Sequence, residues 1–171
     1  MKLWQKKQST HKKIDRFTIG KDREYDLFLA KYDCQASIAH VKMLEKIGVL
    51  SGKESKKIIS ELENIKMESE KGKFIIEDGF EDVHSKIEFL LTKKLGDLGK
   101  KIHTARSRND QVLVALQLFL KEEIYEIKFL TKTFFDLLIG LAEKYENDLM
   151  PGYTHSQIAM PSSFGLWFSA Y

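Results

Sequence analysis

Residues 101–111 read KIHTARSRNDQ and lead directly into a long amphipathic helical pattern. This stretch packs His, Thr, Ser, two Arg, Asn, Asp and Gln into eleven residues. The start of a helix offers unpaired N–H groups and positive dipole charge, and arginine, serine and asparagine add further donors. The sequence therefore predicts that the head of a long helix is built to hold an anion.

The helical pattern beyond this stretch runs from about Arg106 to about Glu146, with apolar residues every three or four positions. Such a helix is roughly 60 Å long, too long for one compact domain of this size. Extra apolar positions widen its stripe, which favours a helical bundle shared between subunits. The alternative is a helix that kinks near Gly140.

The rest of the chain predicts further helices, since its only prolines are Pro151 and Pro161. We expect helices over about 22–47, from a capping box at Ser51 to just before Gly72, and over about 81–95. Residues 1–20 are expected to be an irregular basic arm. The one strand candidate is 74–76, and an apolar helix is expected to begin at Pro161. The predicted fold class is all-α, with an N-terminal helical domain (1–105) that leads into the start of a long-helix bundle (106–171).

The composition excludes several classes of protein. The 28 basic residues are balanced by 25 acidic ones, so there is no electrostatic case for a nucleic acid partner. No apolar run approaches the ~18 residues of a membrane span, and the N-terminus lacks the apolar core of a signal peptide. The single cysteine, Cys34, forms no internal disulfide and is expected to pack in the interior. We therefore expect a cytoplasmic protein. The five histidines are scattered, so no metal site is predicted.

Two groups of polar side chains are candidates for chemistry at helix starts. Ser107, Arg108 and Asn109 have donors suited to carboxylate oxygens. The alternative is that Ser107 or Asn109 only caps the helix and Arg108 is a solvated charge. Asp82 and His84 fall in the first turn of the third helix, where the helix dipole alone explains an aspartate.

Thr154 and His155 form a third candidate group, expected on a loop between two helices. A histidine there is able to move protons at neutral pH, and a neighbouring hydroxyl is able to orient a substrate. A lone histidine is more often structural, so the pattern alone leaves both interpretations open.

The residues 103–111 closely resemble the HTGRSRNDQ signature of the argininosuccinate lyases, in the aspartase/fumarase superfamily. Three more segments resemble this family in the same order: Lys2-Leu3-Trp4, Glu81-Asp82-Val83-His84 and Pro151-Gly152-Tyr153-Thr154-His155-Ser156-Gln157. Four segments in order rarely recur by chance, and together they span nearly the whole chain.

The resemblance implies a lyase without a cofactor that splits argininosuccinate reversibly into arginine and fumarate, as a homotetramer built around a helical bundle. It implies that Ser107, Arg108, Asn109 and Thr154 bind substrate and that His155 takes part in proton transfer, in a direction left open. By the same resemblance, Asp82 and His84 line the cleft as orienting groups.

The sequence departs from the family in several places. Ala105 stands where the family often has glycine, and Met160 replaces a glutamine. The family's N-terminal substrate-binding serine has no clean match, although Thr18 or Asp22 lies in that segment.

The family's flexible loop with a catalytic serine and lysine has no counterpart in this sequence. We therefore expect little or no lyase activity from these 171 residues alone. The alternatives are a non-catalytic helical assembly protein or degenerate lyase paralogue, and, less favoured, an enzyme like adenylosuccinate lyase.

Overall fold

The computed structural model describes residues 11–171 and divides the chain into two compact units, Met1–Leu120 and Lys121–Tyr171. The Lys2-Leu3-Trp4 segment lies outside the described residues. The all-α prediction is confirmed, because helices account for most of the chain and the described residues add only one small hairpin.

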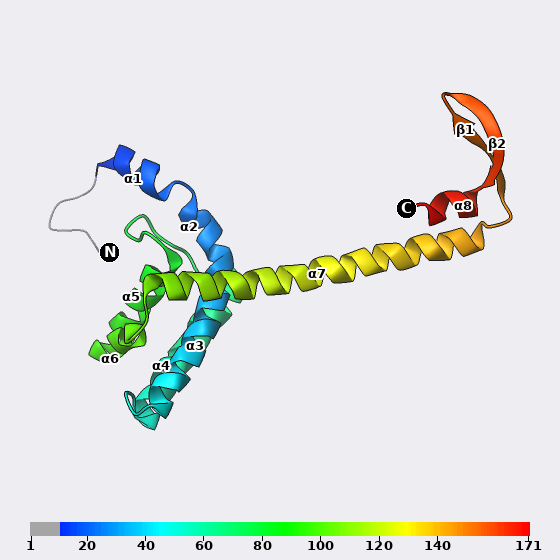
Figure 1. Cartoon of the computed structure of the whole chain (residues 1–171). Coiled ribbons are helices and arrows are strands. Elements are labelled where there is room, and N and C mark those ends of the chain that lie inside the picture. Colours follow the sequence, from blue (N-terminus) through cyan, green and yellow to red (C-terminus); the bar gives the residue numbers. More distant parts are fainter. Residues whose placement is uncertain (1–10) are drawn as a thin grey trace. The chain divides into compact units, whose positions relative to one another are not determined.

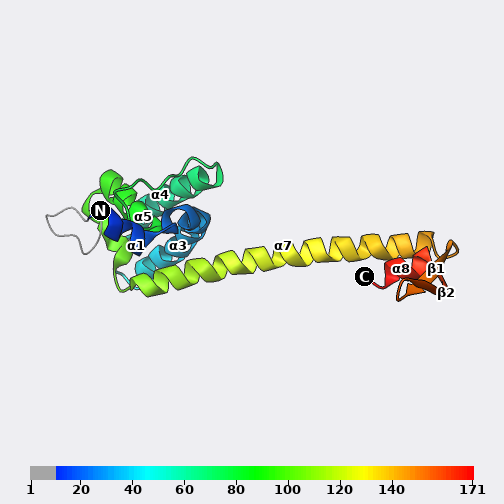
Figure 2. The same cartoon turned by 90° about the horizontal axis from the view of Figure 1, so that it is seen from above.

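The first unit is a cluster of helices (Figures 1 and 2). In chain order they are α1 (Lys12–Ile19), α2 (Asp22–Tyr25), the 3-10 turn η1 (Asp26–Leu29), α3 (Ala30–Lys46), α4 (Gly52–Glu70), α5 (Val83–Leu95), α6 (Asp97–Lys100), the 3-10 turn η2 (Lys101–His103) and the first part of α7 (Arg108–Lys144). Helices α3 and α4 lie side by side, and α5 packs against both. The core between them consists mainly of fully buried aliphatic side chains, including Val41, Leu44, Ile58, Leu62, Ile87 and Leu91.

The predicted helix boundaries in this unit follow from local capping. Ser51 accepts a hydrogen bond from Glu54 N at 3.3 Å, and its own N–H donates to Glu54 Oε2 at 2.9 Å, so the predicted capping box is present. Gly48 and Gly96 adopt positive φ after α3 and α5, as expected of residues that end helices. Cys34 is fully buried in the core, in agreement with its expected packing role.

Two sequence expectations in this unit are wrong. Residues Lys12–Ile19 form α1 rather than part of an irregular arm, with His11 as its N-cap. The strand candidate 74–76 carries no strand: Phe74 and Ile76 pack against the helical core from a connection without regular secondary structure.

The second unit contains the later part of α7, a β-hairpin and the short helix α8 (Phe164–Ser169). Strands β1 (Leu149–Thr154) and β2 (Gln157–Ser163) form an antiparallel hairpin (Figure 1). The pairing has a bulge after Gly152. The expectation of a helix from Pro161 is wrong, since Pro161 lies in β2 and pairs with Pro151. Helix α8 packs back on the end of α7, where Gly165 N donates to Tyr145 O at 2.9 Å.

Helix α7 runs without a break through Gly140, so the alternative of a helix that kinks there is wrong. Only two of its residues, Gln111 and Ala115, are buried. Its part in the second unit has exposed apolar side chains at Ile124, Tyr125, Ile127, Phe129, Leu130, Phe134, Phe135, Leu137 and Ile139. None of the helices within residues 11–171 combines the length and apolar character that a membrane span requires.

Candidate active site

Ser107 is the N-cap of α7. Asp110 N donates to Ser107 Oγ at 3.3 Å, and Ser107 N donates to Asp110 Oδ2 at 3.0 Å. Hydrogen bonds from the backbone N–H and from the side chain of Ser107 to the Asp110 carboxylate lower the pKa of Asp110. Ser107 therefore caps the helix. Its role in substrate binding stays a prediction.

Arg108 lies half-buried directly after this cap. Its Nη1 donates to Gln111 Oε1 at 2.7 Å and lies 3.3 Å from Glu88 Oε1. The expectation of a solvated charge is therefore wrong. Asn109 is exposed. The structure thus separates the three neighbours into a capping serine, a partly buried arginine and a surface amide.

Asp82 and His84 flank the start of α5. Asp82 is its N-cap and accepts from Ser85 N at 2.6 Å, which matches the structural interpretation of this residue. His84 is only 2% exposed, and its Nδ1 lies 3.0 Å from Asp33 Oδ2. The two atoms are close, yet the ring nitrogen is not aligned for a hydrogen bond with any described residue. Val83, which lies between Asp82 and His84 in the sequence, donates its backbone N–H to Asp26 Oδ2 at 3.0 Å.

Four further residues lie at this site for which no role was predicted: Asp33, Ser37, Glu88 and Arg106. Asp33 and Ser37 are fully buried on α3, and Asp33 accepts two hydrogen bonds from Gln111 Nε2. Arg106 Nη1 donates to Ser37 Oγ at 3.1 Å, and burial lowers the pKa of this arginine. The available signal was a pair of polar residues four positions apart on an apolar helix face.

The site in the first unit therefore combines two arginines with a buried polar network. Three elements contribute to it: α3 with Asp33, α5 with His84, and α7 with Arg108 and Gln111. Such a set offers several N–H donors to an anion with carboxylate groups. Within residues 11–171, no three His, Cys, Asp or Glu side chains gather as a metal-binding cluster.

Thr154 and His155 belong to the second unit. His155 and Ser156 form the two-residue turn of the hairpin, at φ of 50° and 62°. The expected loop between helices is thus a tight turn between strands. Thr154 Oγ1 lies 2.9 Å from His155 Nδ1, so these two predicted site residues do meet. An exposed histidine at a strained turn is accessible to a ligand.

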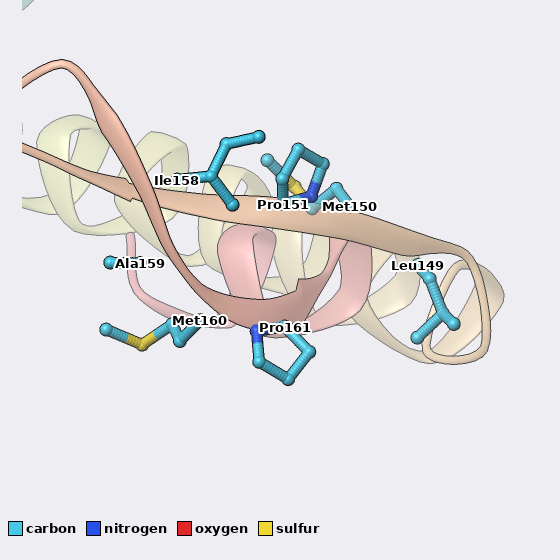
Figure 3. Close-up of a pocket in the computed structure, with 7 residues that line it drawn as sticks. All are labelled: Leu149, Met150, Pro151, Ile158, Ala159, Met160 and Pro161. Atoms are coloured by element: carbon cyan, nitrogen blue, oxygen red, sulfur yellow. The ribbon is translucent and has the colours of Figure 1, made fainter.

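The same hairpin also carries a hollow lined only by apolar residues: Leu149, Met150, Pro151, Ile158, Ala159, Met160 and Pro161 (Figure 3). None of these side chains donates a hydrogen bond. The lining side chains therefore offer no charged or hydrogen-bonding group, and the candidate chemistry lies in the turn and at the head of α7.

Comparison with known proteins gives a consistent family. A sequence model described as "Lyase" matches residues 5–171. Argininosuccinate lyase of Phocaeicola vulgatus is 57% identical over 170 residues, which cover 99% of this chain and 38% of that protein. Argininosuccinate lyase of Bacteroides fragilis is 55% identical with the same coverage, and that of Thermotoga neapolitana is 45% identical over 99% of this chain and 42% of that protein. The chain thus spans about two fifths of the length of these relatives.

Proposed function

Because the chain belongs to the lyase family, we propose that it is part of an argininosuccinate lyase, which splits argininosuccinate reversibly into arginine and fumarate. The observation that carries the proposal is the head of α7. There the capping hydroxyl of Ser107 lies next to two partly buried arginines, Arg106 and Arg108, in a chain 57% identical to an argininosuccinate lyase.

In the proposed reaction, a base removes a proton beside a succinyl carboxylate. The negative charge of the resulting intermediate is stabilised by N–H and O–H donors, for which we propose Ser107, Arg108 and Asn109. An acid then protonates the departing guanidinium nitrogen. We assign proton transfer to His155 without fixing its direction, and substrate contact to Thr154. The 2.9 Å approach of Thr154 Oγ1 to His155 Nδ1 supports their joint action.

We assign orienting roles to Asp82 and His84. Asp82 fixes the start of α5, and His84 is held beside the Asp33 carboxylate. Both residues therefore act on the shape and charge of the site rather than on reacting atoms.

The whole protein is proposed to be a homotetramer with a helical bundle formed by α7 and its copies. The apolar side chains that α7 exposes in the second unit support this proposal, because surfaces of this kind mark protein contacts. We retain the proposed division into a domain of residues 1–105 and a bundle segment of residues 106–171. A cytoplasmic location and the absence of nucleic acid or membrane partners belong to the same proposal.

A chimera tests the activity. The matched segment of the Phocaeicola vulgatus enzyme is replaced by this chain, and fumarate release from argininosuccinate is followed by its ultraviolet absorbance. We expect kcat/KM within about tenfold of the parent, a difference below about 1.4 kcal/mol. The matched control is the chimera with His155→Ala, expected to lose roughly 10²–10⁴-fold in kcat. A chimera that folds and assembles without turnover contradicts the proposal.

A further inference from the structure

The carboxylate of Asp33 is the centre of a buried polar network. It is completely inaccessible to solvent, and its two oxygens accept from Gln111 Nε2 at 2.9 and 3.0 Å. Oδ1 also accepts from Ser37 Oγ at 3.3 Å. Buried charged networks are often no more stable than apolar packing of the same volume. The stability of the unit alone therefore does not account for a carboxylate at this position.

Each of the two residues that donate a hydrogen bond to Asp33, Gln111 and Ser37, in turn accepts one from an arginine. Gln111 Oε1 accepts from Arg108 Nη1 at 2.7 Å, and Ser37 Oγ accepts from Arg106 Nη1 at 3.1 Å. Since an ionised carboxylate only accepts hydrogen bonds, Gln111 must turn its amide NH₂ toward Asp33 and its carbonyl toward Arg108. For the same reason Ser37 gives its proton to Asp33 and keeps a lone pair for Arg106.

In both guanidinium groups the same two nitrogen atoms make no hydrogen bond within the described residues. Nε and Nη2 of Arg106 and of Arg108 are buried and have no hydrogen-bond partner among the described residues. Glu88 adds negative charge 3.3 Å from Arg108 Nη1, yet its Oε1 likewise makes no hydrogen bond within the described part of the chain. The Nε and Nη2 atoms form the edge that binds a carboxylate through two parallel hydrogen bonds.

We infer that Asp33 is a positioning residue that, through Gln111 and Ser37, fixes the orientation in which Arg108 and Arg106 bind a carboxylate group. Asp33 itself does not touch the ligand. The identity of that ligand as the succinyl part of the substrate rests on the proposed function, whereas the arrangement of the arginines is a property of the chain alone.

The first experiment records side-chain ¹⁵N–¹H spectra of the two arginines in the 171-residue chain without ligand. Restrained guanidinium groups give separate, slowly exchanging Nη–H signals. We expect Ser37→Ala to abolish these signals for Arg106 only and Gln111→Leu to abolish them for Arg108 only. Asp33→Asn is expected to abolish both sets.

Ser55→Ala is the matched control. Ser55 is also fully buried, and its hydroxyl has no hydrogen-bond partner among the described residues. The Ser55→Ala substitution removes a buried hydroxyl that is not part of the Asp33 network, so the Nη–H signals of both arginines are expected to persist. If Asp33→Asn fails to fold, the two single substitutions still decide the matter. Signals that are averaged in the wild type, or unchanged in both single variants, overturn the inference.

The second experiment uses the chimera described above. With Ser37→Ala or Gln111→Leu, we expect KM for argininosuccinate to rise about tenfold with a smaller change in kcat. An unchanged KM after the arginine signals are lost also overturns the inference. An inactive parent chimera counts against the proposed function instead, while the ligand-free spectra still test the positioning role.

Discussion

Ser107 and Asp110 cap each other: the Oγ of Ser107 accepts from Asp110 N, and Oδ2 of Asp110 accepts from Ser107 N. The reciprocal bonds satisfy two N–H groups in the first turn of α7. The residue expected to touch substrate therefore also fixes the helix start that carries Arg108.

Replacing Ser107 with alanine should destabilise the chain by about 1 kcal/mol, the usual cost of a lost N-cap. Urea unfolding of the 171-residue chain measures this change. The control is Asn109→Ala, an exposed neighbour expected to change stability by less than about 0.5 kcal/mol. Equal stability of Ser107→Ala and wild type would show that the cap is unimportant in solution.

Replacing Ala105 with glycine should stabilise the chain by about 0.5–1 kcal/mol. Ala105 has φ of 57°, a conformation that costs an L-residue about 1–2 kcal/mol, and the greater freedom of glycine in the unfolded chain offsets part of the gain. Thermal unfolding compares Ala105→Gly with Ala39→Gly. Ala39 is exposed inside α3, where the change to glycine should cost about 1 kcal/mol of stability. Destabilisation by both changes to a similar extent would contradict the prediction.

Glu54 should make stability depend on acid pH. Hydrogen bonds from Lys101 Nζ and from Ser51 hold the pKa of Glu54 down to about 2. A lowered pKa means that the stabilisation is complete above the ordinary glutamate pKa of about 4.3 and is lost as the pH falls toward about 2. Urea unfolding at a series of acid pH values should show this loss in the wild type and a shallower dependence in Glu54→Gln. Lys101→Met should be intermediate, and identical slopes for all three proteins would refute the assignment.

Two glycines of the second unit should respond in opposite ways to alanine. A Cβ at Gly165 would lie 2.5 Å from Glu146 Cα and 2.6 Å from Ala142 O, so α8 could no longer pack on α7. We expect Gly165→Ala to destabilise this unit by about 2–3 kcal/mol. Gly140 lies in the interior of α7 with nothing within 4 Å of the added atom, so Gly140→Ala should stabilise it by up to about 1 kcal/mol. Fluorescence of Trp167, recorded in a Trp4→Phe background, follows the unfolding of both variants. Similar changes in stability for Gly165→Ala and Gly140→Ala would disprove the close packing at Gly165.

The long helices of the first unit were predictable because their ends carry strong local signals, as the Ser51 capping box shows. The hairpin was not, because Pro151 and Pro161 are residues that usually break regular structure. In the structure the two prolines face each other across a two-stranded sheet, where both strands are edges and a missing N–H is tolerated.

The candidate site was predictable only in part. Ser107 and Arg108 lie in one conspicuous polar run, and the sequence located them correctly at the head of a helix. Asp33 lies 78 positions from Gln111, and its importance depends on a tertiary contact that no local pattern encodes. Sequence periodicity identifies the buried face of α3. It does not show whether a polar residue on that face takes part in a site or is only an occasional polar residue in the core.

Asp33 joins α3, α5 and α7 through a single buried carboxylate. Opening the first turns of α7 would strip Gln111 from this carboxylate and leave a buried charge short of donors, so those turns are expected to open together with α3. The amide protons of the two segments should then exchange with solvent as one cooperative unit. The first turns of α7, which carry the candidate site, are therefore stabilised by their contact with the core of the first unit.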